Sequence, residues 1–188
     1  MTLAAAFGSL DAALGCVRAG VREDALLAPA GADCLGMARA YRADAAAFAD
    51  RGDPVNALAA VAYACGWLDA AVAVGLLDGP GSGVGLIEGV VPGEDTPRLE
   101  EKAGRYAAML TAALEASAPA PDPASPVHAS ALSILAVAGA LLAPSVLYLT
   151  CGDLEASLSV SSYAYGWLDA GVRAGLVAIA GDRSLFAV

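Results

Sequence analysis

The sequence predicts an all-α protein built from two tandem three-helix up-and-down bundle units, related by a pseudo-two-fold axis and packed into one helical bundle. The stretch 52–77 returns as 152–177, with thirteen of 26 positions identical, and such similarity at a fixed offset indicates a duplicated structural unit. The chain is 58% hydrophobic and rich in alanine, which favours helices, while few aromatic residues argue against a β-sandwich. Within each copy, apolar residues recur at steps of three and four, the helical spacing.

The repeated stretch predicts the central helix of each unit. Asp53 and Asp153 are good N-caps, and Pro54 suits the first helical position. One apolar stripe runs along the first copy through Leu58, Val61, Cys65, Leu68, Val72 and Leu76. A second stripe beside it contains Tyr63 and Trp67, and a helix with two apolar stripes is expected to be largely buried. Gly66 and its copy Gly166 favour helices poorly, so we expect a neighbouring helix or ring to pass close there.

The helices of the first unit follow in order, and we place this unit at residues 1–79. An apolar stripe predicts a helix over 3–27, which Pro29-Ala30-Gly31 should end. Asp33 can cap a second helix over 34–51. The repeat helix then runs to about Leu77. Short connections between three helices favour an antiparallel bundle.

A Gly/Pro-rich linker is predicted at 80–98, and the second unit at 99–188. The apolar residues within the linker suggest that part of it packs against the bundle. The second unit is expected to have helices over 99–117, 128–150 and 154–180, with a stiff, proline-rich loop over 117–127.

The uncharged stretch 129–150 allows two interpretations. It is long enough to span a bilayer. However, the equivalent slot of the first unit is a charged amphipathic helix, in which Arg42 and Asp44 stand where the second unit has Leu142 and Pro144. We therefore expect a helix buried on both sides between the two units, with its former polar face covered by the first unit or by a second subunit, and a membrane segment as the alternative.

Three residue types repeat at the centre of the duplicated helix and form the candidate ligand-binding set: Tyr63, Trp67, Asp69, Tyr163, Trp167 and Asp169. Plain core packing is one interpretation of these side chains, and a pocket walled by Tyr63, Trp67 and Asp69 is the other. Each aspartate lies in mid-helix among apolar residues, and a buried carboxylate is costly unless it is paired or hydrogen-bonded. It should therefore lie on an exposed edge or meet a partner, for which the first unit offers Arg39, Tyr41 and Arg42.

Composition and motifs exclude several classes of function. A net charge of −10 with a single lysine, Lys102, disfavours nucleic acid and anionic membrane surfaces as partners. The four cysteines lack metal-site spacing, and the only histidine, His128, has no partner acid at helical spacing. The glycine-rich run 79–85 lacks the Lys-Ser/Thr of a phosphate loop. We expect no catalytic residue, no metal site and no cofactor, and, since no signal peptide is apparent, a cytoplasmic protein.

The segments Tyr41-Arg42-Ala43-Asp44, Gly52-Asp53 and Tyr63 to Ala70 resemble the archaeal domain of unknown function 357 family. The resemblance covers 34–77 and returns over 152–177, so it describes a tandem duplication, although the middle helix of the second unit departs from the pattern. It implies an archaeal source and a small three-helix bundle in each unit. It implies no activity.

Four classes of function can be compared with these observations. The first is a non-enzymatic interaction or scaffold protein that has a protein partner or self-associates. The alternative is a small-ligand-binding protein or an enzyme with a pocket between the two Gly-Trp-Leu-Asp helices. An RNA-cleaving helical module of the HEPN kind is disfavoured, because no arginine precedes His128 at the spacing of that nuclease pair. A membrane-associated protein is also disfavoured by this composition.

Overall fold

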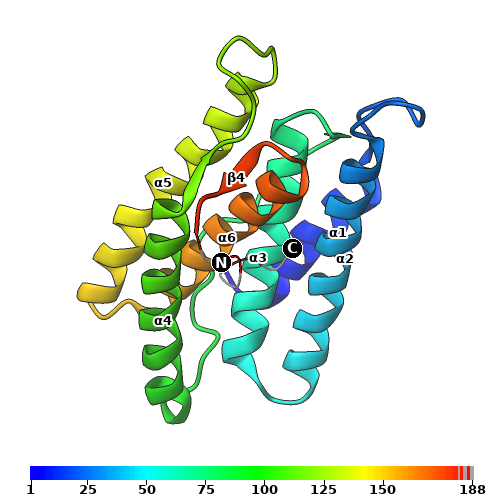
Figure 1. Ribbon diagram of the computed structural model, residues 1–188. Helices are drawn as coiled ribbons and strands as arrows, with labels where there is room; N and C mark the ends of the chain where they lie inside the picture. Colours follow the sequence, from blue (N-terminus) through cyan, green and yellow to red (C-terminus); the bar gives the residue numbers. More distant parts are fainter. Residues whose placement is uncertain (182, 184–185, 187–188) are drawn as a thin grey trace.

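The protein is an all-α bundle, which confirms the predicted fold class. The computed structural model describes residues 1–181, 183 and 186 (Figure 1). The helices are α1 (Leu3–Cys16), α2 (Ala28–Asp50), α3 (Pro54–Ala73), α4 (Thr96–Glu115), α5 (His128–Thr150) and α6 (Leu154–Arg173), and the 3-10 turn η1 (Gly93–Asp95) precedes α4. Four very short strands accompany them: β1 (Arg18–Ala19), β2 (Leu77–Asp78), β3 (Ser117–Pro119) and β4 (Val177–Ile179).

The duplicated helices α3 and α6 lie side by side at the centre of the molecule. Helices α1 and α2 pack on α3, whereas α4 and α5 pack on α6. The outer helices of the two units therefore lie on opposite sides of the central pair (Figure 1). Most residues of α3 are buried, among them Leu58, Trp67 and Leu68. The two apolar stripes therefore correctly predicted a central helix in each unit.

The central helices touch where both copies carry glycine. A β-carbon added to Gly66 would lie 2.2 Å from the carbonyl oxygen of Tyr163, and one added to Gly166 would lie 2.5 Å from that of Tyr63. No side chain fits at either distance, so only glycine allows this approach of two backbones. The close contact expected at these glycines is confirmed, and the neighbour is the other copy of the same helix.

Short antiparallel ribbons end the outer and central helices earlier than the periodicity predicts. The first helix stops at Cys16 instead of residue 27, because the chain turns extended and Arg18 pairs with Asp78. Ser117 pairs with Ile179 in the second unit. Gly75 and Gly175 adopt φ values of 76° and 70° after α3 and α6, a left-handed turn that ends both helices before their predicted limits.

The start of α2 is also corrected. Pro29 was expected to separate two helices, but α2 begins at Ala28 and includes Pro29 in its first turn. A proline at that position loses nothing, since the first amides of a helix have no carbonyl partner within it. The predicted caps of the central helices are confirmed: Asp53 accepts from the amide of Asn56 and Asp153 from that of Ala156.

The segment between the two units packs against the bundle, as its apolar residues suggested. Ile87 is fully buried, and Ser82 is nearly so. Glu155, in the first turn of α6, accepts hydrogen bonds from the amides of Gly89, Val90 and Val91 at 2.6–2.8 Å. This carboxylate, which also suits the positive N-terminal end of the helix dipole, thus holds the connecting segment in place.

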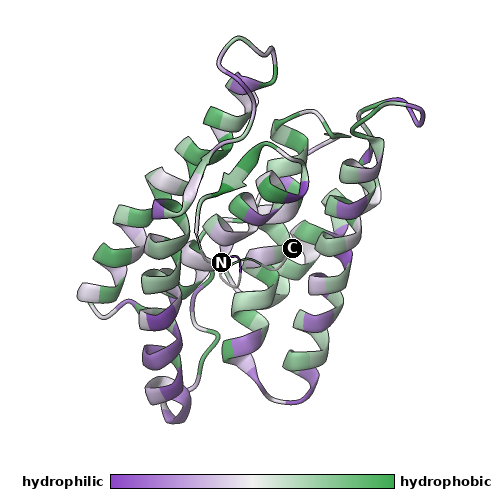
Figure 2. Cartoon of the chain, in the orientation of Figure 1, coloured by the Kyte–Doolittle hydropathy of each residue, from purple (hydrophilic) through white to green (hydrophobic). Residues whose placement is uncertain are grey.

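Helix α5 lies at the edge of the molecule, and the prediction of a helix buried on both sides is wrong. Helices α3 and α5 are both long and apolar enough to span a bilayer, but the apolar window of α3 is 83% buried inside the bundle and that of α5 only 17%. The first unit packs on α6 through α3, so it never reaches the outer side of α5. Figure 2 shows the apolar colouring along this outer helix.

A cavity beside the central helix pair

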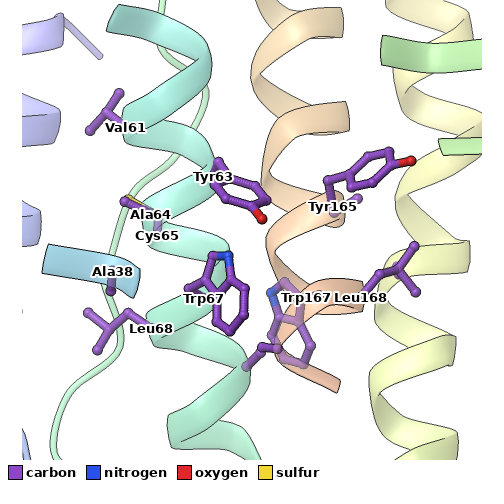
Figure 3. Close-up of a cluster of buried hydrophobic side chains, with 14 of the residues drawn as sticks. Ala38, Val61, Tyr63, Ala64, Cys65, Trp67, Leu68, Tyr165, Trp167 and Leu168 are labelled. Atoms are coloured by element: carbon purple, nitrogen blue, oxygen red, sulfur yellow. The ribbon is translucent and has the colours of Figure 1, made fainter. Parts of the chain in front are cut away.

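The candidate residues meet in pairs across the two units. The Tyr63 hydroxyl of α3 donates a hydrogen bond to Asp169 of α6, and the Tyr163 hydroxyl donates to Asp69 at 2.9 Å. Figure 3 shows Tyr63 reaching from α3 towards α6. The pseudo-two-fold relation of the units therefore produces two reciprocal tyrosine–aspartate pairs.

The proposed arginine partners of Asp69 are not its partners. Arg42 instead binds Asp11 at 2.7 Å, and Arg39 is exposed. Besides Tyr163, Asp69 accepts from the amide and the hydroxyl of Ser82, the latter at 2.7 Å. Its partners thus come from the other unit and from the connecting segment.

Both tryptophans are core residues. Trp67 is fully buried and Trp167 nearly so, with their indoles between the two central helices (Figure 3). The rings of Tyr63 and Trp67 pack edge-on with centroids 6.1 Å apart. Both indoles therefore belong to the core of the bundle. Neither lines the cavity beside the central pair.

A cavity of about 490 Å³ lies on one side of the central pair, between α2 and α3 of the first unit and α4 and α6 of the second. Its walls are mainly aromatic and apolar: Tyr41, Tyr63, Tyr106, Tyr165, Phe48, Phe186, Met109, Ala59 and Ala60. Its polar lining comprises Asn56, Lys102 and Asp169. Of the six residues predicted for ligand binding, only Tyr63 and Asp169 line it.

The only lysine of the chain lines this cavity. The Lys102 ammonium donates to the side-chain oxygen of Asn56 and lies 5.2 Å from the ring centre of Tyr106. Burial lowers the pKa of Lys102, with the nearby Arg105 charge acting in the same direction. A partly desolvated ammonium beside aromatic rings can receive the anionic or acceptor group of a bound molecule.

The equivalent space on the other side of the pair is occupied. Asp69 and Ser9 stand where the cavity has Asp169 and Met109, and Ser82 lies against both. The Ser9 hydroxyl donates to the Ser82 carbonyl at 2.5 Å. The connecting segment therefore closes the first of two related sites, while the second remains a cavity.

Differences between the copies at cavity positions were the signal that sequence reasoning missed. Where the cavity has Lys102, Tyr106 and Tyr165, the equivalent residues are Thr2, Ala6 and Cys65. A comparison of positions 100 residues apart reveals these differences. Each of them gives the second unit a large or charged side chain on the same side of the central pair. Within the described residues, no three His, Cys, Asp or Glu side chains could hold a metal ion together.

Five tyrosines around the central pair have raised pKa values, and burial is the largest cause for each: Tyr41, Tyr63, Tyr106, Tyr163 and Tyr165. The Asp169 charge adds to the effect at Tyr63, and the Asp69 charge at Tyr163. Burial likewise raises the pKa of Cys34 and of Cys65 to about 12.

We expect these groups to make the fold sensitive to alkali. A group with a raised pKa stays protonated in the folded protein at a pH where the unfolded chain has already lost its proton. Its contribution is therefore fully present below the unfolded pKa, about 8.5 for cysteine and about 10 for tyrosine, and falls as the pH rises further. The free energy of unfolding in urea, measured under reducing conditions, should fall between pH 7.5 and pH 11. A constant value across that range would contradict this expectation, and Tyr163→Phe should make the fall shallower.

These features define a class: a duplicated three-helix bundle whose units join through a glycine contact and form a lateral cavity between them. The family model described as "Protein of unknown function (DUF357)" matches residues 7–77 and 105–177. The chain therefore belongs to this family and carries its domain twice. No curated protein and no solved structure matches the chain.

Proposed function

We propose that this protein binds a small molecule in the cavity between α2, α3, α4 and α6. The observation that carries the proposal is the difference between two related sites, one closed by Ser82 and the other left as a cavity of about 490 Å³. Ligand pockets generally measure about 300–1,000 Å³ and combine apolar and aromatic walls with a few polar groups. The lining of this cavity has that character.

The lining favours a compact, mostly apolar ligand with an aromatic ring and one anionic or acceptor group. Tyr41, Tyr106 and Tyr165 supply ring surfaces for packing against such a molecule. Lys102 supplies a positive charge for its polar group. The polar groups of the lining form two hydrogen-bonded pairs, Tyr63 with Asp169 and Lys102 with Asn56, and this arrangement favours binding over catalysis.

Two fluorescent probes of matched shape test the proposal. 1-Anilinonaphthalene-8-sulfonate carries a sulfonate, and N-phenyl-1-naphthylamine is its uncharged analogue. We expect both to bind with one site per chain. Lys102→Thr should weaken binding of the sulfonate about tenfold, roughly 1.4 kcal/mol, and leave the uncharged probe nearly unaffected.

The equivalent position in the other unit supplies, for each residue, a variant that the fold already accommodates. Tyr41→Leu and Tyr106→Ala introduce the residues found at the equivalent Leu141 and Ala6, and we expect each to weaken both probes about tenfold. Tyr148→Phe introduces the residue of the equivalent Phe48 away from the cavity, and should change neither affinity. Equal affinities for all variants, or no saturable binding, would overturn the proposal.

An interaction or scaffold function is the second candidate. The exposed apolar side chains of α5 favour it, since contiguous apolar surface on a protein commonly marks an interaction site. This function does not compete with ligand binding, because α5 contributes no residue to the cavity lining.

A further inference from the structure

The outer face of α5 is uncharged along its whole length and mostly apolar. Leu132 and Leu147 are 48% and 60% exposed, and the exposed positions between them carry Ser133, Ala136, Gly139, Ala140, Ala143 and Val146. No charged side chain occurs anywhere in this helix, from His128 to Thr150. The large side chains thus stand near the two ends of the face, and the small ones at its centre.

Helix α2 is an internal reference for this face, because it has the same length and the equivalent place in the first unit. It exposes Arg39 and Asp44 where α5 has Gly139 and Pro144. It also has alanine at the positions of Leu132 and Leu147. The same three-helix fold therefore has a charged outer helix in the first unit and an uncharged one in the second. This difference indicates that another molecule covers the outer face of α5.

The charges around α5 favour a protein over a lipid bilayer as the molecule that covers its outer face. Helices that lie in or on membranes carry Lys or Arg at their flanks, where they meet lipid headgroups. The chain has neither residue between Arg105 and Arg173, and acidic residues flank α5 at Asp122, Asp153 and Glu155. A protein with a net charge of −10 repels its own copies except where its surface is uncharged, and α5 provides such a surface.

Most exposed positions between Leu132 and Leu147 are symmetric about the middle of the helix, and Ser133 and Val146 are the pair that differs. Leu132 and Leu147, Ala136 and Ala143, and Gly139 and Ala140 are related by reversal about the point between residues 139 and 140. Two such helices that cross antiparallel there would place leucine against leucine at both ends and small residues against small residues at the crossing. Within the chain, α3 and α6 already pack by close approach at a pair of glycines.

We propose that α5 binds α5 of a second copy of this chain, and that the protein is a two-fold symmetric dimer in solution. A two-fold interface uses the same patch on both subunits, and the nearly symmetric order of residues in α5 lets leucine meet leucine and small residues meet small residues across it. The proposal rests on the interaction function, the second candidate above, and gives it a partner. It is independent of the cavity, so the probe experiments can fail without affecting it.

Sedimentation equilibrium of the full chain tests the proposal. We expect a mass of twice 18.5 kDa for the wild type. Ala140→Arg places a charge at the crossing point and should weaken the dimer by at least about a hundredfold, because two buried like charges would face each other. Ala40→Arg makes the same change at the exposed equivalent position of α2, and should leave the dimer intact.

A second variant guards against misfolding. Gly139→Arg introduces the residue that α2 carries at Arg39, which the same fold accepts on its surface, and it should also yield monomers. Circular dichroism should show unchanged helicity in all three variants. A monomeric wild type at about 100 μM, or a dimer that survives both α5 variants, would overturn the proposal. Flotation of the wild type with phosphatidylcholine vesicles, lost in Ala140→Arg, would assign the face to a bilayer and overturn it as well.

Discussion

Replacing Trp67 with alanine is expected to lower the free energy of unfolding by about 3–5 kcal/mol, the range for a large aromatic side chain removed from a core. Trp67 is fully buried, and its indole lies between α3 and α6. Its loss would leave a void beside Tyr63, which supplies the hydrogen bond to Asp169. Urea unfolding followed by circular dichroism measures the loss, and the remaining Trp167 provides a fluorescence signal for comparison.

A matched truncation far from the core checks that result. Leu26 is 94% exposed, so Leu26→Ala should change the free energy of unfolding by no more than about 0.5 kcal/mol. A loss below about 1 kcal/mol for Trp67→Ala would contradict the central place that the packing gives this side chain.

The central pair could be predicted because its signals are local. The helical spacing of apolar residues in α3 can be read from one continuous stretch of sequence, and the duplication shows that α6 repeats this stretch. A glycine kept in mid-helix by both copies, Gly66 and Gly166, indicated a close neighbour. Periodicity describes one helix at a time, however, and it could not say that the neighbour of each glycine is the other.

The partners of the two aspartates could not be predicted for the same reason. Tyr63 lies 106 residues from Asp169, and Tyr163 lies 94 residues from Asp69. Only the packing of the two units brings them together, whereas sequence reasoning considered the adjacent helix and its arginines. The requirement that a buried carboxylate has a partner was correct, although the choice of partner was wrong.

Of the cavity lining, two residues were candidates from the sequence, Tyr63 and Asp169, and the others were not. Asp169 was a candidate because it sits among apolar residues in mid-helix, and burial of its side chain agrees with that. Lys102 and Tyr106 belong to an outer helix, α4, whose packing on α6 the sequence left open. The loss of charge in the slot of α5 was a correct observation, but it indicates an outer apolar face and not a position inside the bundle.

Replacing Gly66 with alanine is expected to lower the free energy of unfolding by about 3 kcal/mol, at the upper end of the range for overpacking. The added carbon would lie 2.2 Å from the Tyr163 carbonyl oxygen and 3.0 Å from the Gly166 α-carbon. These are backbone atoms of the facing helix, so no side-chain rotation relieves the contact and the two helices must separate. Separation would also lengthen the Tyr63–Asp169 and Tyr163–Asp69 hydrogen bonds, since both cross the same gap.

Gly36→Ala is the matched control, because the sign of its effect should be opposite. Gly36 lies in the middle of α2 with nothing within 4 Å of an added β-carbon. Alanine there gains helix propensity without a collision, and should raise the free energy of unfolding by up to about 1 kcal/mol. Urea titration of both variants against the wild type measures the two changes. If Gly66→Ala were as stable as Gly36→Ala, the two units would not be held in contact through this pair of glycines, and the cavity formed between them would lose its structural basis.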